Sequence, residues 1–473
     1  MNLKNMIMKK VYQVGKKGKT PKPRFFLQHM ICEAAGWKPG DTLYVSINEN
    51  NKEVIVQNQS MEQAHKLSVS YREKDGVKRP IIDTAGERYE SIVDIKEKVE
   101  VCVYQGKVII RPLHFKLMEN ATIPTHNDER IRLTSICAGA GIGTSVFKNT
   151  GYFTPVMEIE LEDDSAEVLR HNFPNSFIFN GDLRDCHEVM ESDALLVTLP
   201  CNEYTNLAFG DSGMINHLVL AASKIIESSK AKAIIFENVP QWYKSDSYKT
   251  LKDLLLPKYP YWAEANIESV DCGSLARRNR TYAIATSNRD LLFSFEFPKP
   301  FKNFKRKRKL RNFVDSFKEE NYEWKSLEKW KESFATREAW KERDLSKTFV
   351  TLDAKEIACI PKRYRSHCAS NSYVLNSDKT KWRFLTESEL MRILSVPEWF
   401  EFPSYTPVTR RFEMIGQSVD GRILAAIANN LATAFFKVKH IIQQTVQPET
   451  HQPADIIEHA VIIDEHGQLG LAI

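Results

Sequence analysis

Two apolar runs, each followed closely by a chemically reactive side chain, constrain the fold of this chain most. Residues 194–197 lead into Pro200-Cys201, and residues 233–236 lead into Glu237. Short continuous apolar runs are typical of strands buried on both faces of a parallel sheet. In an open α/β sheet, the residues just past the carboxyl ends of the strands face the ligand crevice. The pattern therefore predicts a cleft where a thiol, which can add to an electrophile, meets a carboxyl group, which can move a proton.

Length and composition bound the class of protein. A chain of 473 residues with 42% hydrophobic residues predicts two or three globular domains. It has no run of eighteen apolar residues, so we expect no membrane span, and its first ten residues lack the apolar region of a secretory signal. The eight cysteines include no CxxC pair, which argues against a zinc ribbon or a disulfide framework and favours a reducing cytoplasm.

The positive charge is concentrated in two runs. The first 24 residues hold eight bases and no acid, and residues 302–311 hold seven bases. Such runs either form solvated tails and linkers or neutralise the phosphates of a nucleic acid.

Two stretches of the first 120 residues look alike. Arg24 precedes a Gly40-Asp41 turn and apolar residues at 43, 45, 47, 54 and 56, and Arg79 precedes apolar residues at 99, 101, 103, 108 and 110. Period-two alternation broken by turn residues predicts β-hairpins. The first stretch is similar to AbrB-like swapped-hairpin domains, which implies a DNA-binding pseudo-dimer made by a tandem pair within residues 1–120. The alternative is a β-rich accessory domain without a DNA role, and residues 113–130 are predicted to be a linker.

Residues 131–200 have the pattern of a nucleotide-binding unit. A β-rich run at 131–136 enters a turn with Gly139 and Gly141, and glycines let the backbone turn tightly and approach a ligand closely. A second strand at 153–157 is predicted to end at Glu158, where an acid can accept the ribose hydroxyls of an adenosine cofactor. A helix at 163–171 and a strand at 177–179 follow, and Asp182 stands where that strand ends, placed to accept from an adenine amino group.

The order of these blocks resembles that of the cytosine C5 DNA methyltransferases over about residues 131–436. The resemblance implies S-adenosyl-L-methionine as the cofactor. It implies cofactor contacts from Cys137, Ala138, Gly139, Gly141, Glu158, Ile159, Asp182, Leu183, Pro200, Leu218 and Gln417. Cys137 and Ile159 replace residues that are often aromatic in the family, which implies weaker binding of the same cofactor. Gln417 replaces an Asn by an amide one methylene longer, which puts its own cofactor contact in doubt.

The resemblance also implies a reaction. Cys201 would attack cytosine C6, and Glu237 would hold N3. In the block 271–282, Arg278 and Arg280 match the family pattern Gln-x-Arg-x-Arg as a clamp on the base, with Ala276 at the Gln position and Arg280 reaching the cytosine O2. Because these base atoms are inaccessible inside a stacked duplex, the base must be flipped out.

The later segments follow the family order as well. Residues 291–414 are basic and rich in aromatic residues, which either form a small core or, by the resemblance, belong to a target-recognition domain. Thr386 with Glu389 predicts a capping box at the start of a helix. Residues 415–419 are predicted to open a helix that returns to the catalytic domain, and residues 441–473 are predicted to be a polar tail with a candidate strand at 460–463.

We therefore expect an α/β protein with three parts. A Rossmann-like S-adenosylmethionine-dependent methyltransferase domain spans 131–290 and 415–440, a smaller target-recognition domain spans 291–414, and a β-rich domain spans 1–120. The expected function is methylation of cytosine C5 in double-stranded DNA by a cytoplasmic, nucleoid-associated enzyme of a bacterium or virus, as a partner in restriction-modification, as a viral enzyme or as an orphan. We expect it to act as a monomer on DNA, without a metal or a membrane. The alternatives are a tRNA cytosine methyltransferase and a DNA-binding regulator that lost catalysis through the changes at 137, 276 and 417.

Overall fold

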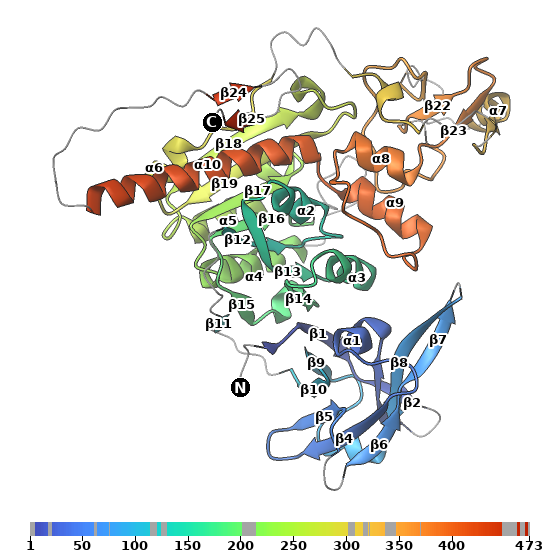
Figure 1. Ribbon diagram of the computed structural model, residues 1–473, viewed down its shortest axis with the longest axis vertical. Coiled ribbons are helices and arrows are strands. Elements are labelled where there is room, and N and C mark those ends of the chain that lie inside the picture. Colours follow the sequence, from blue (N-terminus) through green and yellow to red (C-terminus); the bar gives the residue numbers. More distant parts are fainter. Residues whose placement is uncertain are drawn as a thin grey trace.

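One long sheet joins the N-terminal and central parts of the chain. The computed structural model describes residues 5–17, 21–60, 64–74, 76–113, 121–123, 130–200, 214–300, 308–315, 320, 322–335, 347–368, 370–446, 461–463 and 469–471. Within these residues, thirteen strands form one sheet in the order β18-β19-β17-β16-β12-β13-β14-β1-β9-β10-β5-β4-β6. The sheet runs without interruption from the N-terminal part of the chain into the central part (Figure 1).

The central half of the sheet contains the predicted strands. They are β12 (Ile131–Ile136), β13 (Phe153–Glu160), β14 (Phe177–Asn180), β16 (Ala194–Val197), β17 (Ala233–Asn238), β18 (Tyr261–Glu268) and β19 (Asn279–Thr286). β14, β13, β12, β16 and β17 are parallel, and β19 and β18 complete this edge in antiparallel pairing. The apolar runs that predicted neighbouring buried strands are therefore confirmed as β16 and β17, whose residues are buried because helices cover both faces.

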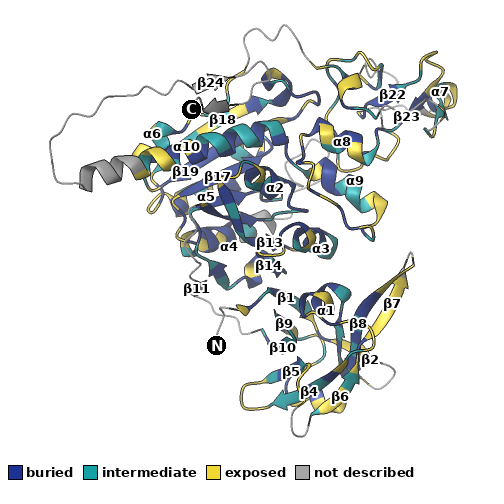
Figure 2. Cartoon of the chain, in the orientation of Figure 1, coloured by how far each residue is buried: buried dark blue, intermediate teal, exposed yellow. Residues whose placement is uncertain are grey.

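Helices cover both faces of this half. The buried side chains of α4 (Met214–Ser228) and α5 (Asp246–Leu255) belong to the core on one face. Those of α2 (Ile142–Asn149), α6 (Arg289–Ser294) and α10 (Gly421–Val446) belong to the core on the other face, and α3 (Asp163–Asn172) follows β13. Figure 1 shows α10 lying across the sheet, and Figure 2 shows the central strands as buried. This layered arrangement confirms the predicted α/β, Rossmann-like fold.

The C-terminal helix begins later and ends later than predicted. α9 (Val408–Gln417) stops at Gln417, and α10 starts at Gly421. Two helices form because the Asp420 carboxylate accepts a hydrogen bond from the Ile423 N–H and so caps the start of α10. α10 then continues to Val446, beyond the predicted boundary at 440.

The N-terminal part is built from β-hairpins. Its elements are β1 (Met8–Gln13), β2 (Gly15–Lys17), β3 (Lys22–Leu27), α1 (His29–Ala34), β4 (Thr42–Asn48), β5 (Glu53–Gln57), β6 (His65–Ser68), β7 (Ser70–Lys74), β8 (Val77–Ala85), η2 (Glu87–Tyr89), β9 (Lys98–Tyr104) and β10 (Lys107–Pro112). The predicted hairpins are confirmed as β4–β5 and β9–β10. Equivalent strands of the two similar stretches pair with each other, β3 with β8 and β5 with β10, as a tandem pair requires.

The segment between α6 and α10 contains a smaller unit. Its elements are η6 (Leu310–Asn312), β20 (Lys325–Ser326), α7 (Leu327–Ala335), β21 (Phe349–Val350), β22 (Tyr373–Leu375), β23 (Lys381–Arg383), α8 (Glu387–Ile393) and α9. Trp330, Tyr373 and Trp382 form a small buried core, which is one of the two roles expected for the aromatic residues of this segment. The predicted capping box of Thr386 and Glu389 at the start of α8 is confirmed.

Short elements complete the described chain. They are β11 (Ala121–Ile123), η3 (Leu183–Asp185), β15 (Glu188–Met190), η4 (Trp242–Lys244), η5 (Ser269–Cys272), β24 (Val461–Ile463) and β25 (Leu469–Leu471). The candidate strand near residue 460 is confirmed as β24, which pairs with β25. Across the parts of the chain that the structure describes, none of the helices combines the length and the apolar character needed to cross a membrane.

Candidate active site

The carboxyl ends of β12, β16 and β17 are tied together by side-chain hydrogen bonds. The Asn238 amide donates to the carbonyl of Leu199 at 3.0 Å, and the Thr198 hydroxyl donates to the carbonyl of Cys137 at 2.9 Å. Both bonds join neighbouring strand ends, so they hold the three ends together. Pro200 is the last described residue of this loop, and the predicted nucleophile Cys201 lies in the range 201–213, outside the described residues.

Glu237 and Arg280 form the charged centre of the site. The Nε of Arg280 lies 3.1 Å from the Oε1 of Glu237, and both side chains are largely buried. This oxygen has no hydrogen-bond partner among the described residues, so the contact is an ion pair without hydrogen-bond alignment. A buried carboxyl oxygen that has an ion-pair partner but no aligned hydrogen bond keeps the capacity to accept one from a ligand. The arrangement therefore leaves one side of the Glu237 carboxyl group ready for a polar ligand.

Arg278 has a different environment from the one predicted. Its side chain is 4% exposed, and its guanidinium donates to the carbonyls of Gly416 and Ile360 at 3.3 and 3.4 Å. A Cβ on Gly416 would lie 2.1 Å from the carbonyl oxygen of Pro361, so the two segments are in direct contact there. Burial lowers the pKa of Arg278. The contacts of Arg278 thus hold the end of α9 against residues 360–361, and its predicted role as a clamp on the base stays a prediction.

The glycine-rich turn is open on one side. Gly139 has φ +58°, and a Cβ built there would meet no atom within 4 Å. Gly141 has φ +85°, and a Cβ there would lie 2.6 Å from side chains of Leu169 and Phe173. Gly141 is therefore required by close packing on α3, while Gly139 borders open space. Cys137 has φ +57°, and burial raises the pKa of its thiol.

The acid beside this turn is Glu160, and the predicted acid Glu158 lies inside the strand. β13 continues three residues past the predicted end at Met157, and Glu158 pairs with Ser135 in the middle of the sheet. Its side chain is fully buried and accepts from the Thr144 hydroxyl at 2.9 Å. Burial raises the pKa of Glu158 to about 8, although neighbouring hydroxyl groups oppose the shift.

Glu160 has the position that the prediction gave to Glu158. Its Oε2 accepts from the N–H of Gly139 at 2.7 Å, and its Oε1 accepts from the N–H of Glu162 at 2.8 Å. Burial raises the pKa of Glu160, and these backbone hydrogen bonds oppose the shift. The following residue, Leu161, is 59% exposed at the end of the strand, whereas the predicted contact Ile159 is buried in the core. The register of β12 against β13 explains why Glu160 and not Glu158 lies beside the turn. Ile136, the last residue of β12, pairs with Ile159, so Glu160 is the residue level with the turn that begins at residue 137.

The third strand end also carries its predicted acid. Asp182 caps the turn η3 and binds the guanidinium and the backbone N–H of Arg184. Arg184 is the main reason that the pKa of Asp182 is lowered, so the carboxylate is charged and held in one orientation. Leu183 is buried beside it in the core.

The two remaining predicted cofactor residues lie on helices. Gln417 is the last residue of α9 and is exposed, and Leu218 on α4 is partly buried against the core beneath the sheet. Gln417 directly follows Gly416, whose carbonyl is held by Arg278. The end of α9 is therefore fixed while its terminal amide stays accessible.

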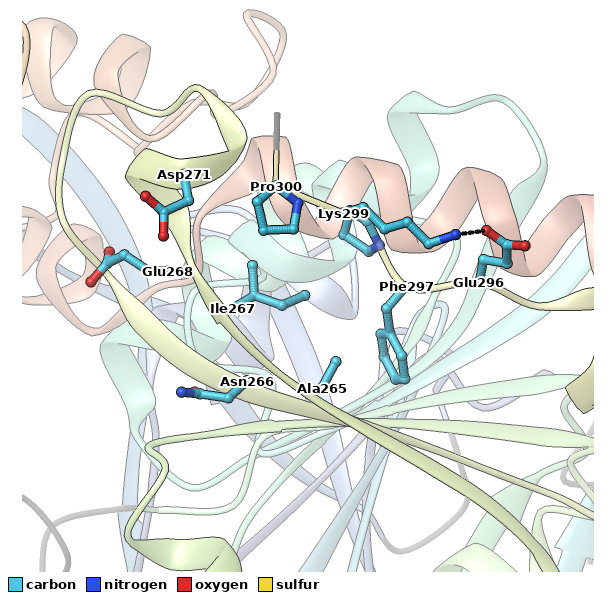
Figure 3. Close-up of a pocket in the computed structure, with 10 residues that line it drawn as sticks. Ala265, Asn266, Ile267, Glu268, Asp271, Glu296, Phe297, Lys299 and Pro300 are labelled. Atoms are coloured by element: carbon cyan, nitrogen blue, oxygen red, sulfur yellow. Dashed lines mark hydrogen bonds and ion pairs between the residues drawn. The ribbon is translucent and has the colours of Figure 1, made fainter. Parts of the chain in front are cut away.

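A separate cavity lies at the outer edge of the sheet. It has a volume of about 520 Å³, and Figure 3 shows Asn266, Glu268 and Asp271 on one side of it and Phe297 and Lys299 on the other. None of the predicted site residues lines it. This cavity is therefore separate from the predicted site, which lies at the carboxyl ends of the parallel strands.

The strand ends have the features of an adenosine site beside a reactive centre. Glu160 and Asp182 offer carboxylates at adjacent strand ends, and Gly139 faces open space between elements that are otherwise packed. These carboxylates can accept hydrogen bonds from the ribose hydroxyls and the exocyclic amine of an adenosine cofactor. Glu237 on β17 lies three strands from β13 along the sheet, and Arg280 lies on the next strand, β19, where the second reactant would bind.

Comparison with known proteins agrees with this arrangement. The model of the C-5 cytosine-specific DNA methylase family matches residues 131–433. The Type II methyltransferase M.Bsp6I of Bacillus sp. is 23% identical over 64% of this chain and 98% of its own length. The Type II methyltransferase M1.ScrFI of Lactococcus lactis subsp. cremoris is 23% identical over 68% of this chain and 83% of its own length.

Solved structures show the same fold. The crystal structure of a mutant Spodoptera frugiperda DNMT2 matches with a TM-score of 0.50 and 16% identity, over 64% of this chain and 99% of that one. The family match covers the glycine turn, both strand ends and the first half of α10, and leaves the N-terminal hairpins outside. The chain belongs to the C-5 cytosine-specific DNA methylase family and is a DNA cytosine-5 methyltransferase.

Proposed function

We propose that this enzyme transfers a methyl group from S-adenosyl-L-methionine to C5 of cytosine in double-stranded DNA, with Cys201 as the covalent nucleophile. The observation that carries the proposal is the Glu237–Arg280 pair, whose carboxyl oxygen lacks a hydrogen-bond partner among the described residues and lies one strand from the Pro200 loop. A cytosine ring presents N3 and O2 on one edge, which match a carboxyl group and a guanidinium side by side.

The residues proposed for the cofactor follow the strand ends. We assign the ribose to Glu160 and the adenine to Asp182, with Leu161 and Leu183 as its apolar neighbours. Gly139 would lie against the cofactor, because its missing side chain leaves the space open. Glu158 and Ile159 are left out of this set because both are buried inside the strand. When bound, S-adenosylmethionine supplies an electrophilic methyl group.

The chain's own residues would activate the cytosine. The Cys201 thiolate adds to C6 while the Glu237 carboxyl group supplies a proton to N3, which makes C5 nucleophilic. Arg280 holds the O2 atom and the Glu237 carboxyl group in one plane. After C5 has taken the methyl group and S-adenosylhomocysteine is left, a base removes the C5 proton and the C6–S bond breaks, which restores the C5–C6 double bond and the thiolate. The N3 proton returns to the Glu237 carboxylate.

The substrate must leave the duplex for this chemistry. Cys201 can reach C6 only if the target base is flipped out of the stack, which costs a few kcal/mol. We propose residues 291–414 as the part that holds the duplex, with one protein molecule per site. The lack of CxxC pairs and the free thiols support a reducing, cytoplasmic setting beside the nucleoid of a bacterium or in a virus-infected cell.

Methyl transfer to defined nucleic acids tests this proposal. The full-length protein is incubated with methyl-labelled S-adenosylmethionine and either genomic duplex DNA or total tRNA, and the labelled nucleoside is identified by mass spectrometry. The proposal predicts labelled 5-methylcytosine in DNA and none in tRNA. Label in tRNA alone, or label at another position of the base, would contradict it.

A further inference from the structure

The N-terminal hairpin domain lies against the adenosine end of the cofactor site. β1 adds to the free edge of β14 in parallel, with Met8 opposite Ile178 and Lys10 opposite Asn180. β14 leads directly into Gly181 and Asp182, so β1 runs beside the segment assigned to the adenine. The family match begins at residue 131, and this contact therefore comes from a part of the chain outside it.

The approach of the two segments is close. A Cβ on Gly181 would lie 3.2 Å from the Cβ of Val11, which is tighter than ordinary van der Waals contact. The Phe179 ring lies at the same 3.2 Å, so a side chain at position 181 would require Val11 or Phe179 to shift by a few tenths of an ångström. The backbone that presents Asp182 is confined on its outer side by the N-terminal domain.

Two lysines of this domain hold the two segments that flank the adenosine. Lys98 on β9 forms an ion pair of 2.7 Å with Asp185, in the turn that Asp182 caps. Lys10 on β1 forms an ion pair of 2.6 Å with Asp163, in the first turn of α3, which begins just after Glu160 and Leu161. Lys98 thus restrains the segment on the adenine side, and Lys10 restrains the segment on the ribose side.

A buried ion network fixes the domain in this position. Lys9 is 1% exposed and binds Glu100 of β9 at 2.8 Å and Glu188 of β15 at 2.5 Å. Removing one partner of a buried ion network leaves an uncompensated charge, so such networks disfavour alternative packings of the two parts. The N-terminal domain is therefore docked in one orientation, and its lysines meet their partners with little further loss of freedom.

We propose that the N-terminal domain is a wall of the adenosine pocket and that Lys10 and Lys98 are positioning residues for cofactor binding. This inference rests on the proposed assignment of Glu160 and Asp182 to the cofactor. Lys10 fixes the start of α3 and with it the Glu160–Leu161 strand end. Lys98 fixes the 182–185 turn. Neither lysine acts on the methyl group or on the cytosine.

The test is calorimetric binding of S-adenosylhomocysteine to the full-length protein. The double variant Lys10→Met with Lys98→Met keeps the aliphatic stems and removes both charges. We expect its dissociation constant to rise by about 5- to 30-fold, because two partly buried ion pairs are lost. In steady-state assays the KM for S-adenosylmethionine should rise while kcat at saturation stays the same, and Lys98→Arg should bind like the wild type.

Lys22→Met is the matched control. Lys22 forms an ion pair with Glu87 at the same 2.7 Å as the Lys98 pair, but inside the N-terminal domain. The affinity of the Lys22→Met variant for S-adenosylhomocysteine should stay within about twofold of that of the wild type. Equal affinities of the double variant and the Lys22→Met variant would overturn the positioning role. A wild-type protein that does not bind S-adenosylhomocysteine would overturn the proposed cofactor, and this inference with it.

Discussion

Glu158 and Glu160 share one face of β13 and have opposite environments. Glu158 is enclosed by hydroxyl groups in the middle of the sheet, whereas Glu160 accepts from the backbone of the glycine turn. The sequence placed the strand end too early, because a carboxyl group inside a strand is rare and usually marks the end of one. Hydroxyl groups from β12 and α2, which satisfy the buried Glu158, are not visible as a pattern along the chain.

Glu160→Gln should weaken cofactor binding. The change keeps the shape of the side chain and removes the charge that would accept the ribose hydroxyls. Hydrogen bonds to a charged group contribute about 1.5–3 kcal/mol, so the dissociation constant of S-adenosylhomocysteine should rise by roughly 10- to 150-fold. Glu158→Gln is the matched control on the same strand, and its affinity should stay within about twofold. The reverse order of the two variants would restore the assignment to Glu158.

Glu158 should also make the stability of the fold depend on pH. Its pKa is about 8 in the folded protein, against an ordinary value of 4.5 for a solvated glutamate, so the folded chain binds the proton more tightly than the unfolded chain. Below about pH 4.5 Glu158 is protonated in both states and the fold has its full stability. As the pH rises from 4.5 toward 8, only the unfolded chain releases the proton, so the free energy of unfolding falls.

Glu158→Gln removes this proton-linked loss. Between pH 5 and pH 9, the free energy of unfolding of the wild type should fall relative to that of the variant by on the order of 3–5 kcal/mol. Denaturant unfolding measured at pH 5, 7 and 9 checks the difference. Parallel pH profiles for the two proteins would show that Glu158 does not titrate in this range.

At the scale of elements, the site depends on where helices and strands end. The sequence predicted β12, β16 and α3 closely, because each has an unbroken apolar run or a clear helical period. It missed the break between α9 and α10, which follows from a cap at Asp420 and from tight contact of Gly416 with residues 361–362. Arg278 contacts Ile360 and Gly416, which are far from it in the sequence. Contacts between such distant segments leave no local pattern, so this structural role of Arg278 could not be predicted.

Arg278→Met and Arg280→Met should separate stability from catalysis. Arg278 holds two backbone carbonyls, and its loss leaves buried acceptors without a donor. We expect the free energy of unfolding of the Arg278 variant to fall by about 2–4 kcal/mol. The Arg280 variant leaves the buried Glu237 carboxyl group without its cation, so its stability should fall as well, and it alone should lose at least about 100-fold in kcat per folded molecule, since a charge-assisted contact to the base is gone. Thermal unfolding and methyl transfer measured on both variants decide between these roles, and a stable Arg278 variant with lost turnover would support the original clamp.

At the scale of the whole molecule, the N-terminal hairpins and the catalytic domain share one sheet. The sequence predicted the hairpins and their tandem arrangement from period-two alternation. It did not predict that β1 joins β14, because the free edge of a parallel sheet has no sequence signature of its own. The predicted role of this domain in binding DNA stays a prediction, and deleting the domain would also remove a strand from the catalytic sheet.

Surface substitutions test the DNA role without disturbing that sheet. Lys16 and Lys17 on β2 and Lys78 on β8 are exposed on one four-stranded sheet, β2-β3-β8-β7. If they contact phosphates, replacing all three with Gln should make the slope of log affinity against log salt shallower by about 2–3. Fluorescence anisotropy with duplex DNA at several salt concentrations measures this slope.

The matched control replaces three exposed lysines on the α4–α5 side with Gln, Lys230, Lys249 and Lys258. Their slope should equal that of the wild type. Equal slopes for both triple variants would show that the exposed bases of the hairpins do not contact DNA phosphates.

Trapping the covalent intermediate tests the central claim most directly. The full-length protein is incubated with S-adenosylmethionine and duplex DNA in which 5-fluorocytosine replaces cytosine, so that the C5 substituent cannot leave as a proton and the adduct accumulates. Peptide mapping of the denatured complex should place the DNA on Cys201. Cys201→Ala should give no adduct, and the control Cys359→Ala, at an exposed cysteine, should give the wild-type yield. An adduct on another cysteine, or methyl transfer that persists in Cys201→Ala, would contradict the account.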